Sequence, residues 1–156
     1  LDGHEFNLHN ESEYLTPGDV IISVGETVAN GDAFRQLSLE LMYNAFDTMT
    51  ENGMTYRYYS NYVNGTDANV MNSFMSRQGT LGMLLEVRGI GYGLNNYARR
   101  VLSHVVSAES AITYVAENAA RVQAVVDAER QKAAELAKKQ EKSTLHLHFC
   151  IGCDIL

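Results

Sequence analysis

The residue whose chemistry fits its surroundings least is Glu86, which lies in the apolar segment 82–89 (GMLLEVRG). In a strand, alternation places Leu84, Glu86 and Arg88 on one side and Met83, Leu85 and Val87 on the other. Burying an unpaired carboxylate costs several kcal/mol, so a protein either pairs it or uses it. Two interpretations stay open: a structural ion pair with Arg88, and a general base that takes a proton from a reacting group.

The second candidate is His4, in the segment Asp2-Gly3-His4. A catalytic zinc ion typically needs three protein ligands and an open position for water. No His-x-x-Glu pair supplies the other two, because the residue three places after each histidine is Asn, Ser, Phe or Ile. The sequence taken alone therefore does not build a zinc site of the His-His-Glu kind.

Residues 143–156 differ abruptly from the charged helical segment before them and contain the only two cysteines. His146, His148 and Cys150 would share one side of a strand, and Cys150 and Cys153 have the Cys-x-x-Cys spacing of metal ligands. Two interpretations are open: a small site for zinc or another soft metal, and a disordered or vector-derived tail. Since no cysteine precedes this tail, the rest of the chain does not indicate a redox compartment.

The elements that must position these residues alternate between strands and helices, which predicts an α/β fold. We expect strands near 1–6, 54–63 and 80–88, a strand or a buried turn at 20–24, and helices at 33–51, 68–77 and 94–142. Asp32 is the expected N-cap of the first helix, and Asn52-Gly53 its stop. The apolar face of that helix consists of Phe34, Leu37, Leu41, Ala45 and Met49. The last helix has an apolar stripe with a break near Ser107, and the stripe consists of Leu94, Tyr97, Val101, Val105, Ile112 and Val115.

Size and charge limit the remaining possibilities. The chain has 156 residues, 46% of them hydrophobic, which is enough for one core, placed here in residues 1–142. Its net charge of -7 argues against nucleic acid or an anionic membrane as the partner. The chain begins at Leu1, without an initiator methionine and inside a motif-like segment, so we expect a piece of a longer protein.

Two of these segments together resemble the zinc carboxypeptidase family. In that family an Asp-x-His element at a strand end gives a zinc ligand, and a later strand carries a Glu, an Arg two residues on and then a glycine-containing loop. Here Asp2-Gly3-His4 and the segment 84–89 (LLEVRG) stand in that order, and the resemblance covers about residues 1–117. It implies a partial α/β/α layered sheet with a long C-terminal helix, the C-terminal part of the catalytic domain.

The resemblance also implies roles for individual residues. His4 would bind zinc, Glu86 would act as the general base, and Tyr62 and Arg88 would contact a peptide substrate. The family's other two zinc ligands and its carboxylate-binding Asn-Arg element would lie before Leu1. This sequence departs from the family at Glu5, where the family often has Ser. The resemblance further implies a secreted or periplasmic protein, and a deacylase of N-acyl amino acids is a neighbouring activity with similar zinc chemistry.

Because one histidine does not complete a zinc site, we expect the 156-residue chain to be inactive as a peptidase and to hold zinc weakly or not at all. A rival interpretation is a non-catalytic interaction module, in which the helix 94–142 pairs with a partner or a second copy. A partial α/β domain would expose apolar faces, so a homo-oligomer or a covering partner chain is expected in either case.

Overall fold

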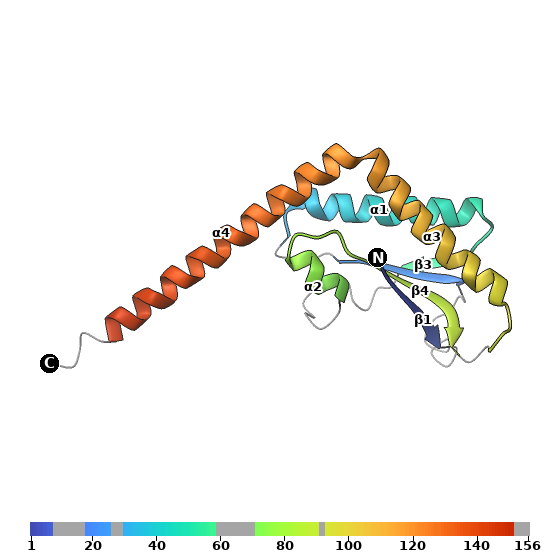
Figure 1. The fold of residues 1–156 in the computed structure, drawn as a ribbon, viewed down its shortest axis with the longest axis horizontal. Coiled ribbons are helices and arrows are strands. Elements are labelled where there is room, and N and C mark those ends of the chain that lie inside the picture. Colours follow the sequence, from blue (N-terminus) through green and yellow to red (C-terminus); the bar gives the residue numbers. More distant parts are fainter. Residues whose placement is uncertain (8–17, 26–29, 59–70, 91–92, 152–156) are drawn as a thin grey trace.

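The fold was determined as a computed structural model, which describes residues 1–7, 18–25, 30–58, 71–90 and 93–151 (Figure 1). Its elements are β1 (Asp2–Asn7), β2 (Val20–Val24), α1 (Asp32–Glu51), β3 (Tyr56–Tyr58), α2 (Met71–Arg77), β4 (Met83–Ile90), α3 (Tyr97–Glu117) and α4 (Ala119–Ile151). The chain has a mixed α/β fold, as the sequence predicts.

The strands form one mixed sheet in the order β1-β4-β2-β3. β1 runs parallel to β4, β2 runs antiparallel to β4, and β3 runs parallel to β2. The two strands at the centre of this order, β2 and β4, pair Val20 with Val87 and Val24 with Met83. β2 is buried along its whole length, as expected for a strand between two neighbours.

Helices α1 and α3 cover one face of the sheet (Figure 1). The apolar face predicted for α1 is confirmed, since all five of its residues are buried. Four of them, Leu37, Leu41, Ala45 and Met49, share one core cluster with alternate residues of the two central strands, namely Val20, Ile22, Val24, Met83, Leu85 and Val87. The helix stops at the predicted place: Asn52 is its C-cap, and Gly53 adopts a positive φ of 63°.

Several boundary predictions were wrong. Asp32 is the first residue of α1 rather than its N-cap; Gly31 takes the cap position, and Asp32 instead accepts a hydrogen bond from Arg35 in the first turn. β4 begins at Met83 and continues through Gly89 to Ile90. The last helical region is divided at Asn118 rather than near Ser107, because the helix turns there into α4.

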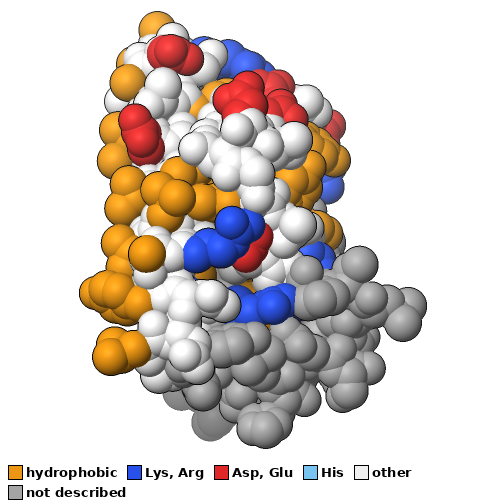
Figure 2. All heavy atoms as spheres, turned by 90° about the vertical axis from the view of Figure 1, so that its right-hand side faces the viewer, with side chains coloured by type: hydrophobic (Ala, Val, Ile, Leu, Met, Phe, Trp, Pro, Cys, Tyr) orange, Lys and Arg blue, Asp and Glu red, His pale blue; other side chains and the backbone are white. Residues whose placement is uncertain are grey.

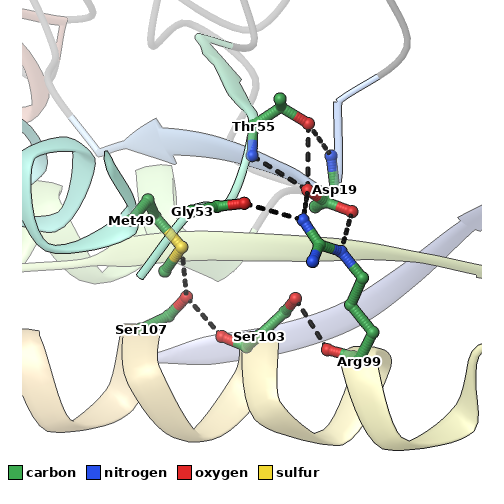
Figure 3. Close-up of polar contacts among 7 residues, drawn as sticks. All are labelled: Asp19, Met49, Gly53, Thr55, Arg99, Ser103 and Ser107. Atoms are coloured by element: carbon green, nitrogen blue, oxygen red, sulfur yellow. Dashed lines mark hydrogen bonds and ion pairs between the residues drawn. The ribbon is translucent and has the colours of Figure 1, made fainter. Parts of the chain in front are cut away.

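The side of α3 that faces α1 is rich in serine rather than in large apolar residues. Ser103, Ser107 and Ser110 are buried, and their small side chains allow the two helices to approach closely. The Ser107 hydroxyl donates to the Ser103 carbonyl at 2.7 Å, and that of Ser103 to the Arg99 carbonyl at 2.9 Å (Figure 3). Bonding back to the preceding turn satisfies hydroxyls that burial would otherwise leave without a partner.

The last helix, α4, runs away from the body of the molecule (Figure 1). Its first half is anchored by Glu129, a buried carboxylate that accepts hydrogen bonds from the Gly31 backbone at 3.0 Å and the Asn30 side chain at 3.1 Å. Glu129 thereby binds the N-terminus of α1. The backbone remains helical up to Ile151. The predicted metal ligands of the tail lie outside the residues whose side chains are described.

Candidate functional site

Strand pairing brings the two candidate catalytic residues together. His4 of β1 and Glu86 of β4 are direct partners in the register of this parallel pair. Neighbouring strands lie about 4.8 Å apart, and register partners project to the same face of a sheet. Leu85 and Val87, which flank Glu86, enter the core under α1 and α3, so Glu86 and His4 lie on the opposite face. His4 is exposed and Glu86 half-buried.

The same row continues across the other two strands. Ile21 of β2 pairs with Glu86 and also with Arg57 of β3, so His4, Glu86, Ile21 and Arg57 follow one another across the sheet. Ile21 is buried, and each of the three polar side chains interacts with its surroundings. Arg57 was not singled out in the sequence, because only the pairing of β3 with β2 places this cation in line with Glu86.

Arg88 lies on the Glu86 side of β4, one pleat further along, and its partner on β1 is Phe6. It is half-buried and has an interaction partner. An ion pair between Arg88 and Glu86 stays a prediction, as does a role for Arg88 in binding substrate. Tyr62, the other predicted substrate contact, lies outside the described residues.

The side chain of Glu5 lies on the opposite face of the sheet from that of its neighbour His4. Its carboxylate accepts hydrogen bonds from Arg100 of α3, with the Arg100 Nε at 3.1 Å. Gly89 makes room for this pair, since a Cβ built there would lie 2.2 Å from the Glu5 Cδ. Burial lowers the pKa of the nearby His104 imidazole, while the Glu5 charge acts in the other direction. At the position where the carboxypeptidase family often has Ser, this chain therefore has an anchor for α3.

A second network holds α3 to the start of β2 (Figure 3). The Asp19 carboxylate accepts hydrogen bonds from Arg99 Nε at 2.8 Å and Arg99 Nη2 at 2.7 Å, and from the Thr55 backbone at 2.9 Å. Arg99 also donates to the Gly53 carbonyl at 2.9 Å. The Arg99 hydrogen bonds, with those from Thr55, lower the pKa of Asp19 from 3.8 to about 2, against the effect of burial. Asp19 and Arg99 therefore act as a structural clamp.

The described residues do not form a complete metal centre. Among them, no three side chains of His, Cys, Asp or Glu are grouped closely enough to hold an ion. In this part of the chain the His4–Glu86 pair therefore does not belong to any such group. In the same described residues, no helix is both long and apolar enough to cross a membrane.

Comparison with protein-family models, curated proteins and solved structures gives no match for this chain.

Proposed function

We propose that this chain contributes a general base, Glu86, and one metal-binding histidine, His4, to the active site of a zinc-dependent carboxypeptidase. The observation that carries the proposal is the register of β1 and β4, in which these two residues are direct partners. Sequence patterns alone point to both residues, and two unrelated residues would more often fall on strands that are not neighbours or on opposite faces of the sheet.

The surroundings of Glu86 suit a carboxylate that handles protons. It lies half-buried on the sheet face away from α1 and α3, next to the buried Ile21 and Leu84. Partial burial weakens the competition from solvent, and a carboxylate in such a place can take a proton from a water molecule that attacks a carbonyl group. The exposed His4 beside it leaves that water accessible from outside.

The residues of the described part do not fit a complete zinc site, because among them His4 and Glu86 are not joined by further His, Cys, Asp or Glu side chains in a group that could hold the ion. We therefore assign no step to the metal in this chain. The proposal is that the remaining ligands come from outside these residues, and the 156-residue chain itself is expected to bind zinc weakly and to hydrolyse no peptide.

Cobalt(II), a paramagnetic substitute for zinc, tests the pairing of His4 with Glu86. The protein is labelled with ¹⁵N, and the tail residues His146, His148, Cys150 and Cys153 are replaced by Ala or Ser so that they do not compete for the ion. Paramagnetic shifts are expected to centre on the backbone amides around positions 4 and 86. His4→Ala should weaken binding by about tenfold, as loss of a direct or supporting metal contact typically does.

The matched control is His104→Ala, which removes a histidine from the other face of the sheet and should leave the shifts unchanged. Shifts centred elsewhere, or an unaltered titration of His4→Ala, would refute the assignment of His4 as a ligand. Release of C-terminal residues from a peptide by the zinc-loaded chain would show that the site is complete, and would contradict the proposal that ligands are missing.

A further inference from the structure

Helix α3 turns its most apolar face to solvent. The stripe that the sequence predicts along this helix is exposed throughout: Ile112 is 70% exposed, Tyr97 58% and Val105 52%, and Val101 and Val115 are exposed as well. Figure 2 shows hydrophobic side chains gathered along the left-hand side of the view. The helix is thus reversed relative to an ordinary surface helix, which buries its apolar stripe and exposes its polar face.

No charge interrupts this stripe. At 3.6 residues per turn, Tyr97, Val101, Val105, Ile112 and Val115 fall within about 80° of one another around the helix axis. The charged residues of α3, namely Arg99, Arg100, Glu109 and Glu117, fall outside that sector. Single exposed apolar residues are ordinary on a surface, but a continuous uncharged stripe of this length marks an interaction site.

The two halves of the stripe differ in shape. The N-terminal half carries large projecting side chains, which are Leu94, Tyr97, Val101 and Val105. The C-terminal half borders an open apolar groove of about 500 Å³. Its α3 side combines the small residues Ala108, Ala111 and Ala116 with Ile112 and Val115 of the stripe. Ala119 lies at its α4 end, and the buried Leu41 and Met83 contribute to its floor. The N-terminal half of the stripe is therefore a row of projecting side chains, and the C-terminal half borders a hollow.

From this shape we infer that α3 docks against α3 of a second copy of this chain, antiparallel and across a two-fold axis. An isologous contact requires a surface that complements itself, and a ridge beside a hollow on one helix meets that requirement. With the axis between positions 106 and 107, Tyr97 faces Ala116 of the second copy, Val101 faces Ile112, and Val105 faces Ala108. Tyr97 and Val105 then meet alanines that line the groove, Val101 meets Ile112 at its border, and each contact occurs twice.

The dimensions suit a weak dimer. From Tyr97 to Val115 the helix rises about 27 Å, and a helix with its side chains is about 10 Å across, so a contact along α3 covers roughly 270 Å² per copy before the groove is counted. An ordinary stable interface buries roughly 800 Å² per partner, so we expect the dimer to form toward the upper end of the protein concentrations tested. The absence of charge on the stripe means that no like charges meet across the axis.

Sedimentation velocity across a range from low micromolar to near-millimolar protein tests the inference. The chain should form dimers, and Val101→Glu and Ile112→Glu should each weaken dimerisation by at least about tenfold, because each places two charges in an apolar contact. Circular dichroism checks that the variants fold. The matched controls are Met71→Glu on α2, where the methionine is 60% exposed, and Leu136→Glu on α4. Both controls should dimerise as the original chain does.

Cysteine pairing tests the antiparallel geometry, with Cys150 and Cys153 replaced by Ser. A chain carrying both Val101→Cys and Ile112→Cys should form disulfide-linked dimers on mild oxidation. The single variant Val101→Cys should not, because in the antiparallel arrangement its two copies lie about 16 Å apart along the axis, beyond disulfide reach. A monomer at all concentrations would overturn the inference, as would a dimer that only Leu136→Glu disrupts. Efficient crosslinking of Val101→Cys alone would overturn the antiparallel arrangement.

This inference rests on α3 and is independent of the proposed function, since the stripe and the His4–Glu86 pair belong to different faces of the molecule. Failure of the cobalt experiment would leave the dimer untouched, and a monomeric chain would leave the pairing of His4 with Glu86 unchanged.

Discussion

Replacing Asp19 with Asn should destabilise the protein in a way that depends on pH. In the folded state the Asp19 pKa is about 2, against 3.8 for the free side chain. Each pKa unit corresponds to 1.36 kcal/mol, so the pairing of the carboxylate is worth at most about 2.4 kcal/mol at neutral pH. About half of the Arg99 side chain is exposed, however, and solvent screens the pair. The expected loss is therefore about 1 kcal/mol.

The sign of the pH dependence follows from the direction of this shift. Because folding lowers the Asp19 pKa, its contribution is complete above about pH 5 and is lost as the pH falls toward 2. At about pH 3 roughly half of it should remain, and at about pH 2 less than a quarter. The difference in unfolding free energy between the original chain and Asp19→Asn should shrink accordingly.

Urea unfolding followed by far-UV circular dichroism measures this difference at neutral pH and at about pH 3. With a slope of about 2 kcal/mol per molar urea, the neutral midpoint should fall by about 0.5 M. Asp127→Asn is the matched control: this exposed carboxylate on α4 accepts a hydrogen bond from Gln123 within its own helix, and its loss should cost little at either pH. An Asp19→Asn effect that does not change with pH would refute the reasoning.

A double-mutant cycle with Arg99→Gln separates the ion pair from the other contacts of Asp19. The coupling energy between the two positions should be about 1 kcal/mol at neutral pH. A coupling near zero would mean that the hydrogen bonds to Thr55, rather than Arg99, account for the stability that Asp19 provides.

Two further predictions concern the anchors of α3 and α4. Gly89→Ala should destabilise the fold by about 1–2 kcal/mol, because the new methyl group displaces the Glu5 carboxylate. Urea unfolding should show that this cost is largely removed when Glu5 is also replaced by Ala. An equal cost with and without Glu5→Ala would contradict this explanation. Glu129→Ala should cost about 1–3 kcal/mol by thermal or urea unfolding, since it leaves the Gly31 N–H at the start of α1 without its acceptor. Lys132→Ala, which keeps that acceptor and removes a half-exposed ion pair with Glu129 at 3.6 Å, should cost less than about 0.5 kcal/mol.

The sequence alone was sufficient for features that depend on neighbours along the chain. The buried face of α1 follows from the 3.6-residue spacing of its apolar residues, and its end follows from Gly53, which adopts the positive φ that the stop requires. The alternation along β4 correctly separated the core residues from the side that carries Glu86. Asp32 failed as an N-cap because an acidic residue is favoured in the first turn as well as at the cap.

Other features depend on contacts between distant segments, and only the tertiary structure decided them. The sequence indicated His4 and Glu86 as separate candidates. They become neighbours only because the first and last strands pair in parallel, and local sequence propensity does not determine the register of that pairing. The pairing of β3 with β2 likewise places Arg57 in line with Glu86. Periodicity likewise identified the apolar stripe of α3, yet it states which residues share a face and not what that face meets. In this fold the serine side of α3 packs on α1, and the apolar side faces outward.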